Sequence, residues 1–320
     1  MAEQAPRNLI ISGATGWLGQ EVLALLETEK SQASAFEVIA ISSKKRILEH
    51  PTGHNMVTHT YDEIDSIGQV DGFVNLAFLT REKVLEVGYQ QFVLRNLDLI
   101  SQASQVIERS KPQWVVLVSS GAIFKKSTDQ LETSISENPY GFLKWIEELL
   151  LTDAAARVGA KIVIGRLWGA TGRYMPINRA YALSDFVCQA DVGGPIKVRS
   201  GHQVFRRYCD AGDFMNVLIR LAESGRSSTL NSGGPLIEIG DLAHEVARHF
   251  KDVVIDRAPV DSTSIDDYYP RSNDFEDMAH QMNVALTSIS AQIERTVMGY
   301  HDRIHKTLLV DPTPTNGSST

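Results

Sequence analysis

Short apolar runs alternate with stretches of helical periodicity through the first half of the chain. The apolar runs are Leu9 to Ser12, Phe36 to Ile41, Gly72 to Ala77, Trp114 to Val118 and Lys161 to Ile164. Apolar residues spaced as on one face of a helix occur in Gln20 to Glu29, Tyr89 to Arg109 and Pro139 to Arg157. Continuous apolar runs are typical of strands buried on both faces of a parallel sheet. The pattern predicts an α/β fold with a Rossmann-like, doubly wound parallel sheet.

The pattern becomes irregular after Gly169, which indicates a smaller second domain. Glycine-proline turns occur at 193–195 and 233–235, and helices are expected near 213–223, 242–250 and 289–300. We expect an NAD(P)-binding domain in residues 1–168, with 203–235 returning to it, and a C-terminal substrate-binding domain in 169–202 and 236–310. Residues 311–320 are rich in Pro, Ser, Thr and Gly, a composition that favours a disordered tail.

Composition and charge exclude several classes of protein. The formal net charge is -8, which argues against nonspecific binding to nucleic acid. No apolar stretch reaches the ~20 residues that a membrane span needs, and the N-terminus lacks the apolar core of a signal peptide. Two cysteines cannot make a disulfide framework, so a reducing, cytoplasmic environment is expected.

A glycine-rich turn joins the first predicted strand to the first predicted helix. Backbone N–H groups at such a helix N-terminus favour a phosphate group. The three glycines allow the tight turn, the close approach of a diphosphate and the close packing of helix on strand. The turn therefore predicts a dinucleotide site, with cofactor contacts from Gly13, Thr15, Gly16, Trp17, Leu18 and Gly19.

Ser42 follows the second strand, at the position where dinucleotide-binding folds usually have an acidic residue for the adenosine ribose. Ser43, Lys44, Lys45 and Arg46 follow, without a carboxylate nearby. The missing anion removes repulsion against a 2′-phosphate, and charged hydrogen bonds add roughly 1.5–3 kcal/mol each. We therefore predict NADP as the cofactor, with contacts from Ser42, Ser43, Lys44 and Arg46. The alternative is a solvated basic loop beside an NAD site.

Tyr140 and Lys144 are four residues apart in a predicted helix, which puts them on one helix face. An ammonium about 4 Å from a phenol contributes about 4 kcal/mol at an effective dielectric near 20, enough to lower a tyrosine pKa by ~3 units. Ser120 follows the Trp114 strand, and parallel sheets bind ligands at the carboxyl ends of their strands. Ser120, Tyr140 and Lys144 are the predicted catalytic residues.

Taken together, these motifs resemble the extended short-chain dehydrogenase/reductase family, in its branch of nucleotide-sugar epimerases, dehydratases and reductases. The resemblance covers about residues 7 to 300. It implies that Tyr140 is the acid/base, that Lys144 holds the nicotinamide ribose and that Ser120 orients the reacting oxygen. It implies further cofactor contacts from Asp62, Leu76, Ala77, Phe78 and Asn96, and substrate contacts from Ser120, Gly121, Ala122 and Arg206.

The same resemblance carries expectations about partners. The leading arginine of Arg206-Arg207-Tyr208 would bind the diphosphate of a nucleotide-diphosphate sugar. The helices of 89–109 and 139–157 pair across a two-fold axis in the family, which implies a homodimer. Gly169 replaces an asparagine that is common after the strand containing Arg166, and Phe124 stands where many members have tyrosine. These two departures affect the substrate contacts.

The leading functional prediction is an NADPH-dependent reductase of the C4 keto group of a deoxy nucleotide sugar, in polysaccharide biosynthesis. Dehydratases of this branch have an Asp-Glu pair where this chain has Gly121-Ala122, so elimination of water is not expected. The alternative is a C4 epimerase that retains NAD(P) and uses the same three residues. A noncatalytic cofactor sensor fits the intact Ser, Tyr and Lys set less well, and a small aldehyde or flavonoid-type ketone substrate leaves Arg206 unexplained.

Overall fold

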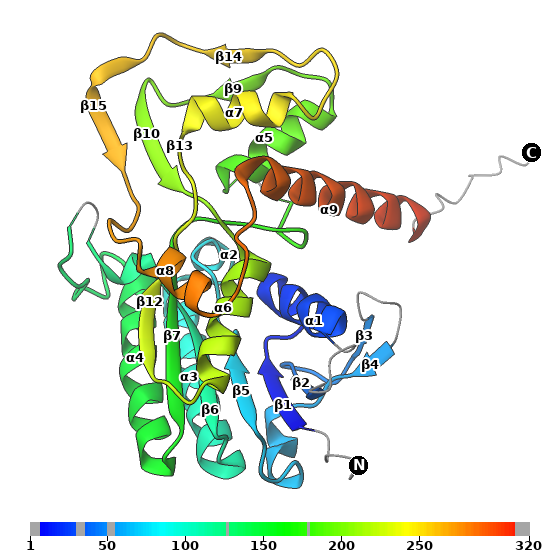
Figure 1. The fold of residues 1–320 in the computed structure, drawn as a ribbon, viewed down its shortest axis with the longest axis vertical. Helices are drawn as coiled ribbons and strands as arrows, with labels where there is room; N and C mark the ends of the chain where they lie inside the picture. The colour runs from blue at the N-terminus through cyan, green and yellow to red at the C-terminus, as the bar shows by residue number, and fades with distance from the viewer. Residues whose placement is uncertain (1–6, 30–35, 50–54, 126–127, 178–179, 311–320) are drawn as a thin grey trace, which may run out of the picture.

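Six parallel strands form the central sheet of this computed structural model, which describes residues 7–29, 36–49, 55–125, 128–177 and 180–310. The strand order is β12-β7-β6-β5-β1-β2, and every neighbouring pair is parallel. The strands are β1 (Arg7–Ser12), β2 (Phe36–Ile41), β5 (Gly72–Asn75), β6 (Trp114–Ser120), β7 (Lys161–Leu167) and β12 (Ser228–Asn231). The order crosses between β1 and β5, so the predicted Rossmann-like, doubly wound sheet is confirmed (Figure 1).

Helices cover both faces of this sheet, as its continuous apolar strands require. Val115 and Leu117 of β6 pack with residues of α3 (Tyr89–Ser110) and α4 (Pro139–Val158). Val116 and Val118 face the other way and pack with residues of α1 (Trp17–Glu29), α6 (Ala211–Glu223) and α8 (Asp274–Gln281). The alternation along β6 therefore fills two separate cores.

A smaller part of the molecule, here called the upper lobe, lies above the sheet in Figure 1. Its sheet has the order β13-β10-β15, and β14 pairs with β9 beside it. The elements are β9 (Ile196–Val198), β10 (His202–Arg207), β13 (Leu236–Glu238), β14 (Ile255–Arg257), β15 (Asp261–Asp267), α5 (Ala182–Asp191), α7 (Ile239–Ala247) and α9 (Ile289–Val310). After β10 the chain returns to the main sheet as α6 and β12. The exact domain boundaries stay a prediction, and the tail 311–320 lies outside the described residues.

Short elements connect these parts. A hairpin of β3 (Ile47–Glu49) and β4 (Asn55–Val57) follows β2, and β8 (Ala170–Thr171) pairs with β11 (Cys209–Asp210). The remaining elements are η1 (Tyr61–Ser66), α2 (Lys83–Val87) and η2 (Gly121–Ile123). In the described part of the chain, no helix combines the length and the apolar character needed to cross a membrane.

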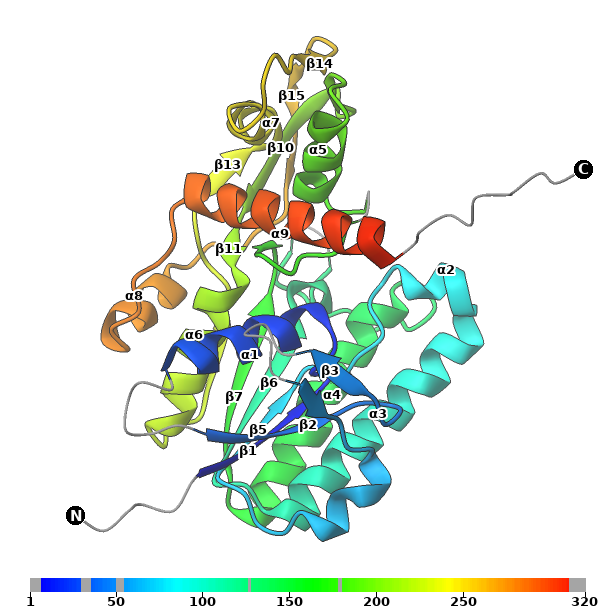
Figure 2. The ribbon, with the colours of Figure 1, turned by 90° about the vertical axis from the view of Figure 1, so that its right-hand side faces the viewer.

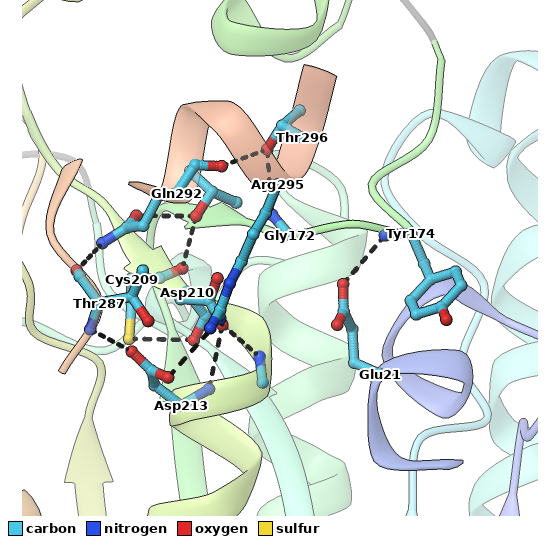
Figure 3. A network of polar contacts seen from close by, with 12 residues as sticks. Glu21, Gly172, Tyr174, Cys209, Asp210, Asp213, Thr287, Gln292, Arg295 and Thr296 are labelled. Carbon is cyan, nitrogen blue, oxygen red and sulfur yellow. Dashed lines mark hydrogen bonds and ion pairs between the residues drawn. The ribbon is translucent and has the colours of Figure 1, made fainter. Parts of the chain in front are cut away.

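Polar contacts fasten the upper lobe to the main sheet (Figure 3). Asp210 caps α6 by accepting from the backbone N–H groups of Gly212 and Asp213, at 3.0 and 3.2 Å. Arg295 of α9 lies 3.1 Å from the same carboxylate, and Asp213 accepts from the backbone N–H of Thr287 at 2.6 Å. Figure 2 shows α9 crossing above α1 and α6. These contacts hold the upper lobe over the carboxyl ends of the strands of the central sheet.

Candidate active site

The glycine turn lies where β1 meets α1, and its backbone has room only for glycine. Gly13 has φ +72°, and a Cβ atom there would lie 2.9 Å from both Leu76 C and Ala77 N. A Cβ atom on Gly19 would lie 2.5 Å from the Gly13 carbonyl oxygen. The predicted residues Leu76 and Ala77 thus lie directly beside the turn. Because α1 begins at Trp17, the backbone N–H groups without an intrahelical partner lie at this turn. The turn and the start of α1, here called the glycine cradle, therefore fit a dinucleotide diphosphate.

Other residues predicted to contact the cofactor lie on or next to the glycine turn and pack against its neighbours. Leu18 packs against the core that α1 shares with α6, and Thr15 is partly exposed on the turn. Asn96 is buried on α3 and accepts a hydrogen bond from the backbone N–H of Leu79 at 2.8 Å. Asn96 therefore fixes the segment that follows β5, which includes Phe78.

Ser42 directly follows β2, and its hydroxyl forms its contacts within its own loop. The side chain is buried, donates to the Lys44 carbonyl oxygen at 2.6 Å and lies 2.8 Å from Thr58 Oγ1. Lys45 forms an ion pair with Glu63 of η1, with 2.7 Å between Nζ and Oε1. Ser42 thus orders the basic loop.

The remaining side chains of this loop are on the surface. Ser43, Lys44 and Arg46 are exposed, and Asp62 is exposed on η1. Lys44 and Arg46 are therefore the cations of the loop that a ligand at the end of β2 can reach.

Ser120 and Tyr140 meet because α4 begins against the end of β6. Asn138 caps α4 by accepting from the Gly141 N–H at 3.0 Å, and its Nδ2 donates to the Ala122 carbonyl at 3.1 Å. A Cβ atom on Gly141 would lie 1.9 Å from that carbonyl oxygen, so glycine allows the contact. The Ser120 hydroxyl lies near enough to the Tyr140 phenol to lower its pKa, and Ser120 Oγ accepts from the Ala122 N–H at 3.2 Å.

Lys144 lies one turn further along α4 and is buried. Its Nζ donates to the Val118 carbonyl at 2.8 Å and to Glu147 Oε2 at 2.9 Å. It also lies 3.9 Å from the centre of the Phe78 ring, and Phe78 meets Tyr140 edge-on at 5.8 Å. The structure therefore brings the predicted catalytic side chains together, with Phe78 among them. Sequence analysis missed Glu147, although its position three residues after Lys144 puts it on the same helix face.

The pKa of Tyr140 is raised to about 12 in this arrangement. Burial of the phenol is the largest cause, and the nearby charge of Glu147 adds to it, whereas the hydrogen bond with Ser120 acts in the opposite direction. The expected net lowering of this pKa does not occur in the structure as described, because burial of the phenol outweighs the other influences on it.

An aromatic pocket of about 330 Å³ opens beside this group. Its walls include Phe124, Trp168 and Tyr268; the first two rings stack at 6.0 Å, and the last two lie 4.8 Å apart. Trp168 Nε1 donates to Asn231 at 2.9 Å, which fixes the indole. Sequence analysis singled out Phe124 but missed Trp168 and Tyr268, because no local pattern connects positions about 100 residues apart.

The predicted substrate arginine lies behind the wall of this pocket. Arg206 Nη2 is 3.1 Å from Asp266 Oδ1, Nη1 donates to the Asp266 carbonyl, and the guanidinium is 5.8 Å from the Tyr268 ring. The charge of Arg206 is therefore balanced by Asp266. The structure also explains why position 169 is a glycine, because a Cβ atom there would lie 2.4 Å from the Arg207 carbonyl oxygen.

A protein-family model matches most of the length of this chain. The model of the NAD dependent epimerase/dehydratase family matches residues 9–233. A curated relative, UDP-glucuronic acid decarboxylase 6 of Arabidopsis thaliana, is 22% identical over 266 residues, which cover 77% of this chain and 76% of the relative.

Solved structures with the same fold include two epimerases. UDP-N-acetylglucosamine 4-epimerase from Methanobrevibacter ruminantium M1, in complex with UDP-N-acetylmuramic acid, has a TM-score of 0.71 at 17% identity and covers 94% of this chain and 100% of its own. UDP-glucuronic acid 4-epimerase from Bacillus cereus, in complex with NAD, has a TM-score of 0.70 at 16% identity and covers 91% and 95%. At these identities the likeness is one of fold.

Proposed function

Because the chain belongs to the NAD dependent epimerase/dehydratase family, we propose that this enzyme is an NAD(P)-dependent C4 epimerase of a nucleotide-diphosphate sugar. The observation that carries the proposal is the convergence of Ser120, Tyr140 and Lys144 beside the glycine cradle. A nicotinamide dinucleotide in that cradle would supply the acceptor and donor of a hydride.

The side chains have separate tasks in this reaction. Ser120 and Tyr140 would present hydroxyls to the same reacting oxygen. Tyr140 would take the proton of a carbinol as it becomes a ketone, and later return it, when the positive charge of an oxidised nicotinamide lowers the pKa of its phenol. Lys144 uses two of its three N–H groups on protein acceptors, which leaves one donor for a ribose or for the phenol. In an epimerase the hydride would return to the opposite face of the sugar carbon and the proton to its oxygen, so the cofactor would not be consumed.

A 4-epimerase is favoured over other members of the branch by two considerations. Gly121 and Ala122 provide no acid and base for the elimination of water. The solved structures that share the fold include 4-epimerases of UDP-sugars. The Arabidopsis relative is a UDP-glucuronic acid decarboxylase, so UDP-glucuronic acid belongs among the substrates tested.

A second candidate, an NADPH-dependent C4 keto reductase, is favoured by the end of β2. No carboxylate follows the strand there, and Lys44 and Arg46 are exposed. Two cations at this place favour the 2′-phosphate of NADP. The same loop is compatible with NAD if its cations remain solvated.

We also propose that two copies of the chain associate through α3 and α4. These helices pack side by side. Their outer surfaces have apolar side chains that are 41–53% exposed: Tyr89, Leu94, Leu97, Leu149 and Leu150. A second copy would cover them.

Product analysis distinguishes the two functions. The purified protein is incubated with UDP-glucose, UDP-N-acetylglucosamine or UDP-glucuronic acid and a trace of NAD⁺, and the sugars are followed by NMR. The epimerase gives a C4 epimer without net NADH. The reductase gives no epimer, but oxidises NADPH stoichiometrically with a nucleotide-4-keto sugar. Tyr140→Phe is the control for turnover by a contaminant, and failure of both assays with all substrates would contradict the proposal.

A further inference from the structure

A buried carboxylate accompanies the active-site lysine. Glu147 is 1% exposed and Lys144 is 5% exposed, and their charged groups are 2.9 Å apart. The second oxygen, Oε1, accepts from Asn75 Nδ2 at 2.9 Å, and Asn75 Oδ1 accepts from Ser12 Oγ at 2.6 Å. A continuous polar chain therefore runs from Lys144 to the end of β1, beneath the glycine turn.

We propose that Glu147 is a positioning residue that acts through Lys144: it is the counter-ion that fixes the ammonium beneath Tyr140 and limits how strongly that charge acts on the phenol. This rests on the proposed redox function, because it concerns the acid/base group of that reaction. A lone buried ammonium tends to lose its proton, and a lone buried carboxylate to gain one. Burial raises the pKa of the Glu147 carboxyl, and the Lys144 ammonium and the Asn75 amide act against that rise. The contact with Lys144 thus favours the charged carboxylate, at the cost of a weaker field at Tyr140.

The geometry supports a defined position for the ammonium. Glu147 and the Val118 carbonyl hold two N–H groups of Lys144, and the Phe78 ring lies on one side at 3.9 Å. Asn75 and Ser12 in turn fix the carboxylate, and they end two strands of the central sheet. The lysine is therefore oriented by the sheet and by its own helix together.

Other charged and titratable groups lie around this pair, Tyr61 and Tyr140. On α4, Glu148 is tied to Arg166 by two hydrogen bonds of 3.0 and 2.7 Å. The groups contributed by other elements are Tyr61 of η1, Asp98 of α3, Arg81 and Glu82 before α2, and Tyr181 and Tyr268 near the phenol. Glu147 is the carboxylate among the described residues that contacts Lys144 directly.

The sign of the effect follows from the charges. Glu147 raises the pKa of Tyr140, so its neutral replacement should lower that pKa. Glu147 is seven residues from Tyr140, about 10 Å along the helix, and a unit charge at that distance shifts a pKa by about one unit at an effective dielectric near 20. Glutamine keeps the shape, and its amide pairs with Asn75 if the Asn75 amide turns over.

The direct test is the titration of Tyr140 in the full-length protein without cofactor or substrate. The nine tyrosines are labelled with ¹³C at the phenol carbon, and Tyr140→Phe assigns the resonance. In Glu147→Gln the ionised fraction of Tyr140 at about pH 10.5 should be roughly eightfold larger than in the wild type. The matched control is Glu148→Gln, which removes the next carboxylate of the same helix and should move the titration less than half as far.

Two further measurements keep the test decisive. If Glu147→Gln does not fold, Lys144→Met/Glu147→Gln removes both charges, and its Tyr140 titration should stay close to the wild-type curve. With a substrate identified, the acid limb of kcat/KM for carbinol oxidation should move down by about one pH unit in Glu147→Gln. An unchanged or higher Tyr140 pKa in a folded Glu147→Gln protein, or a raised one in the double variant, overturns the inference. Because the titration needs no turnover, failure to find a substrate leaves it intact.

Discussion

The indole of Trp168 covers Gly121: a Cβ atom added to this glycine would lie 2.2 Å from Trp168 Cδ2. Gly121 follows Ser120 directly, so the contact joins the reacting end of the site to the aromatic pocket. The structure of the pocket therefore depends on the absence of a side chain at one position.

Gly121→Ala should displace the indole and lose about 1–3 kcal/mol of the free energy of unfolding, as overpacking does in other cores. Chemical denaturation measures this loss, and KM for the nucleotide sugar should rise at the same time. Gly201→Ala is the matched control, because a Cβ atom there meets nothing within 4 Å. Equal stability of the two variants would contradict the close contact.

Tyr140→Phe removes the titrating hydroxyl and keeps the ring against Phe78. Turnover should fall by about 10²–10⁴-fold, the usual contribution of a general acid/base, while the affinity for the cofactor changes little. Steady-state kinetics and calorimetry measure the two quantities. Tyr89→Phe, on the outer surface of α3, should keep wild-type turnover. A Tyr140→Phe enzyme with near-normal kcat would rule out this residue as the proton donor.

The cofactor preference depends on the exposed cations after β2. Lys44→Ala and Arg46→Ala should each weaken NADPH binding about tenfold or more, and leave NADH binding unchanged, because a charged hydrogen bond is worth roughly 1.5–3 kcal/mol. Ser42→Asp should shift the preference towards NADH, since it restores an anion opposite the 2′-phosphate. Titration calorimetry of both cofactors is the measurement.

Lys45→Ala is the control for these variants, because Lys45 is already paired with Glu63. High salt should reduce the effects of Lys44 and Arg46, whose side chains are exposed. A wild-type preference for NADH would mean that the basic loop is solvated surface and would favour the epimerase.

Association through α3 and α4 predicts that a charge on their outer surface separates the copies. Leu94 is 53% exposed on α3, and Leu94→Glu should convert a homodimer into monomers at micromolar concentration, as measured by light scattering. Val254→Glu places the same charge on an exposed side chain of the upper lobe and should leave the mass unchanged. A monomeric wild-type protein would contradict the proposal.

Glu21 should make stability depend on pH. Burial raises the pKa of its carboxyl from the ordinary 4.5 to about 7, although the backbone N–H of Tyr174 donates to it at 3.0 Å (Figure 3). Between these values the unfolded chain releases the proton and the folded one retains it. The free energy of unfolding should therefore fall by up to about 3 kcal/mol as pH rises from 4.5 to 7, with no further contribution above that range.

Glu21→Gln removes this dependence, because an amide does not titrate. Denaturation curves at pH 5, 6, 7 and 8 should show a variant that resembles the wild type at the lowest pH and is more stable at the highest. Glu37→Gln, at an exposed position of β2, should leave the pH dependence unchanged. A wild type whose stability is constant across the range would contradict the shift.

Local periodicity predicted five of the six strands of the central sheet, but not the edge strand β12, Ser228–Asn231. The apolar run at β2 predicted both of its ends, and α4 begins at Pro139 with Asn138 as its cap, as a helix start requires. In the upper lobe the helices α7 and α9 were predicted, near 242–250 and 289–300, but the strands were not. Its strand β15, Asp261–Asp267, is largely exposed and polar, so no apolar alternation marks it.

The candidate site was predictable where its chemistry is local in sequence. Sequence motifs of recognisable spacing contain Gly13, Ser120, Tyr140 and Lys144. The structure brings these residues together at the carboxyl ends of the central strands. Glu147 was missed because a glutamate on a helix is usually a solvated surface residue, and only its burial reveals another role. Asp266 was missed because its pairing with Arg206 joins β15 to β10, about 60 residues apart in sequence.

The place of β12 in the sheet has a consequence for biosynthesis. The glycine turn and the Ser120, Tyr140 and Lys144 group are all synthesised before residue 168, and they depend on strands β1, β2, β5, β6 and β7. The edge strand β12, Arg206 and the α9 anchor at Arg295 leave the ribosome much later. A nascent chain therefore has every residue of the cofactor cradle while the substrate side is still missing. One face of that half stays uncovered until α6 and α8 are synthesised, so the cofactor site should reach its full stability only in the complete chain.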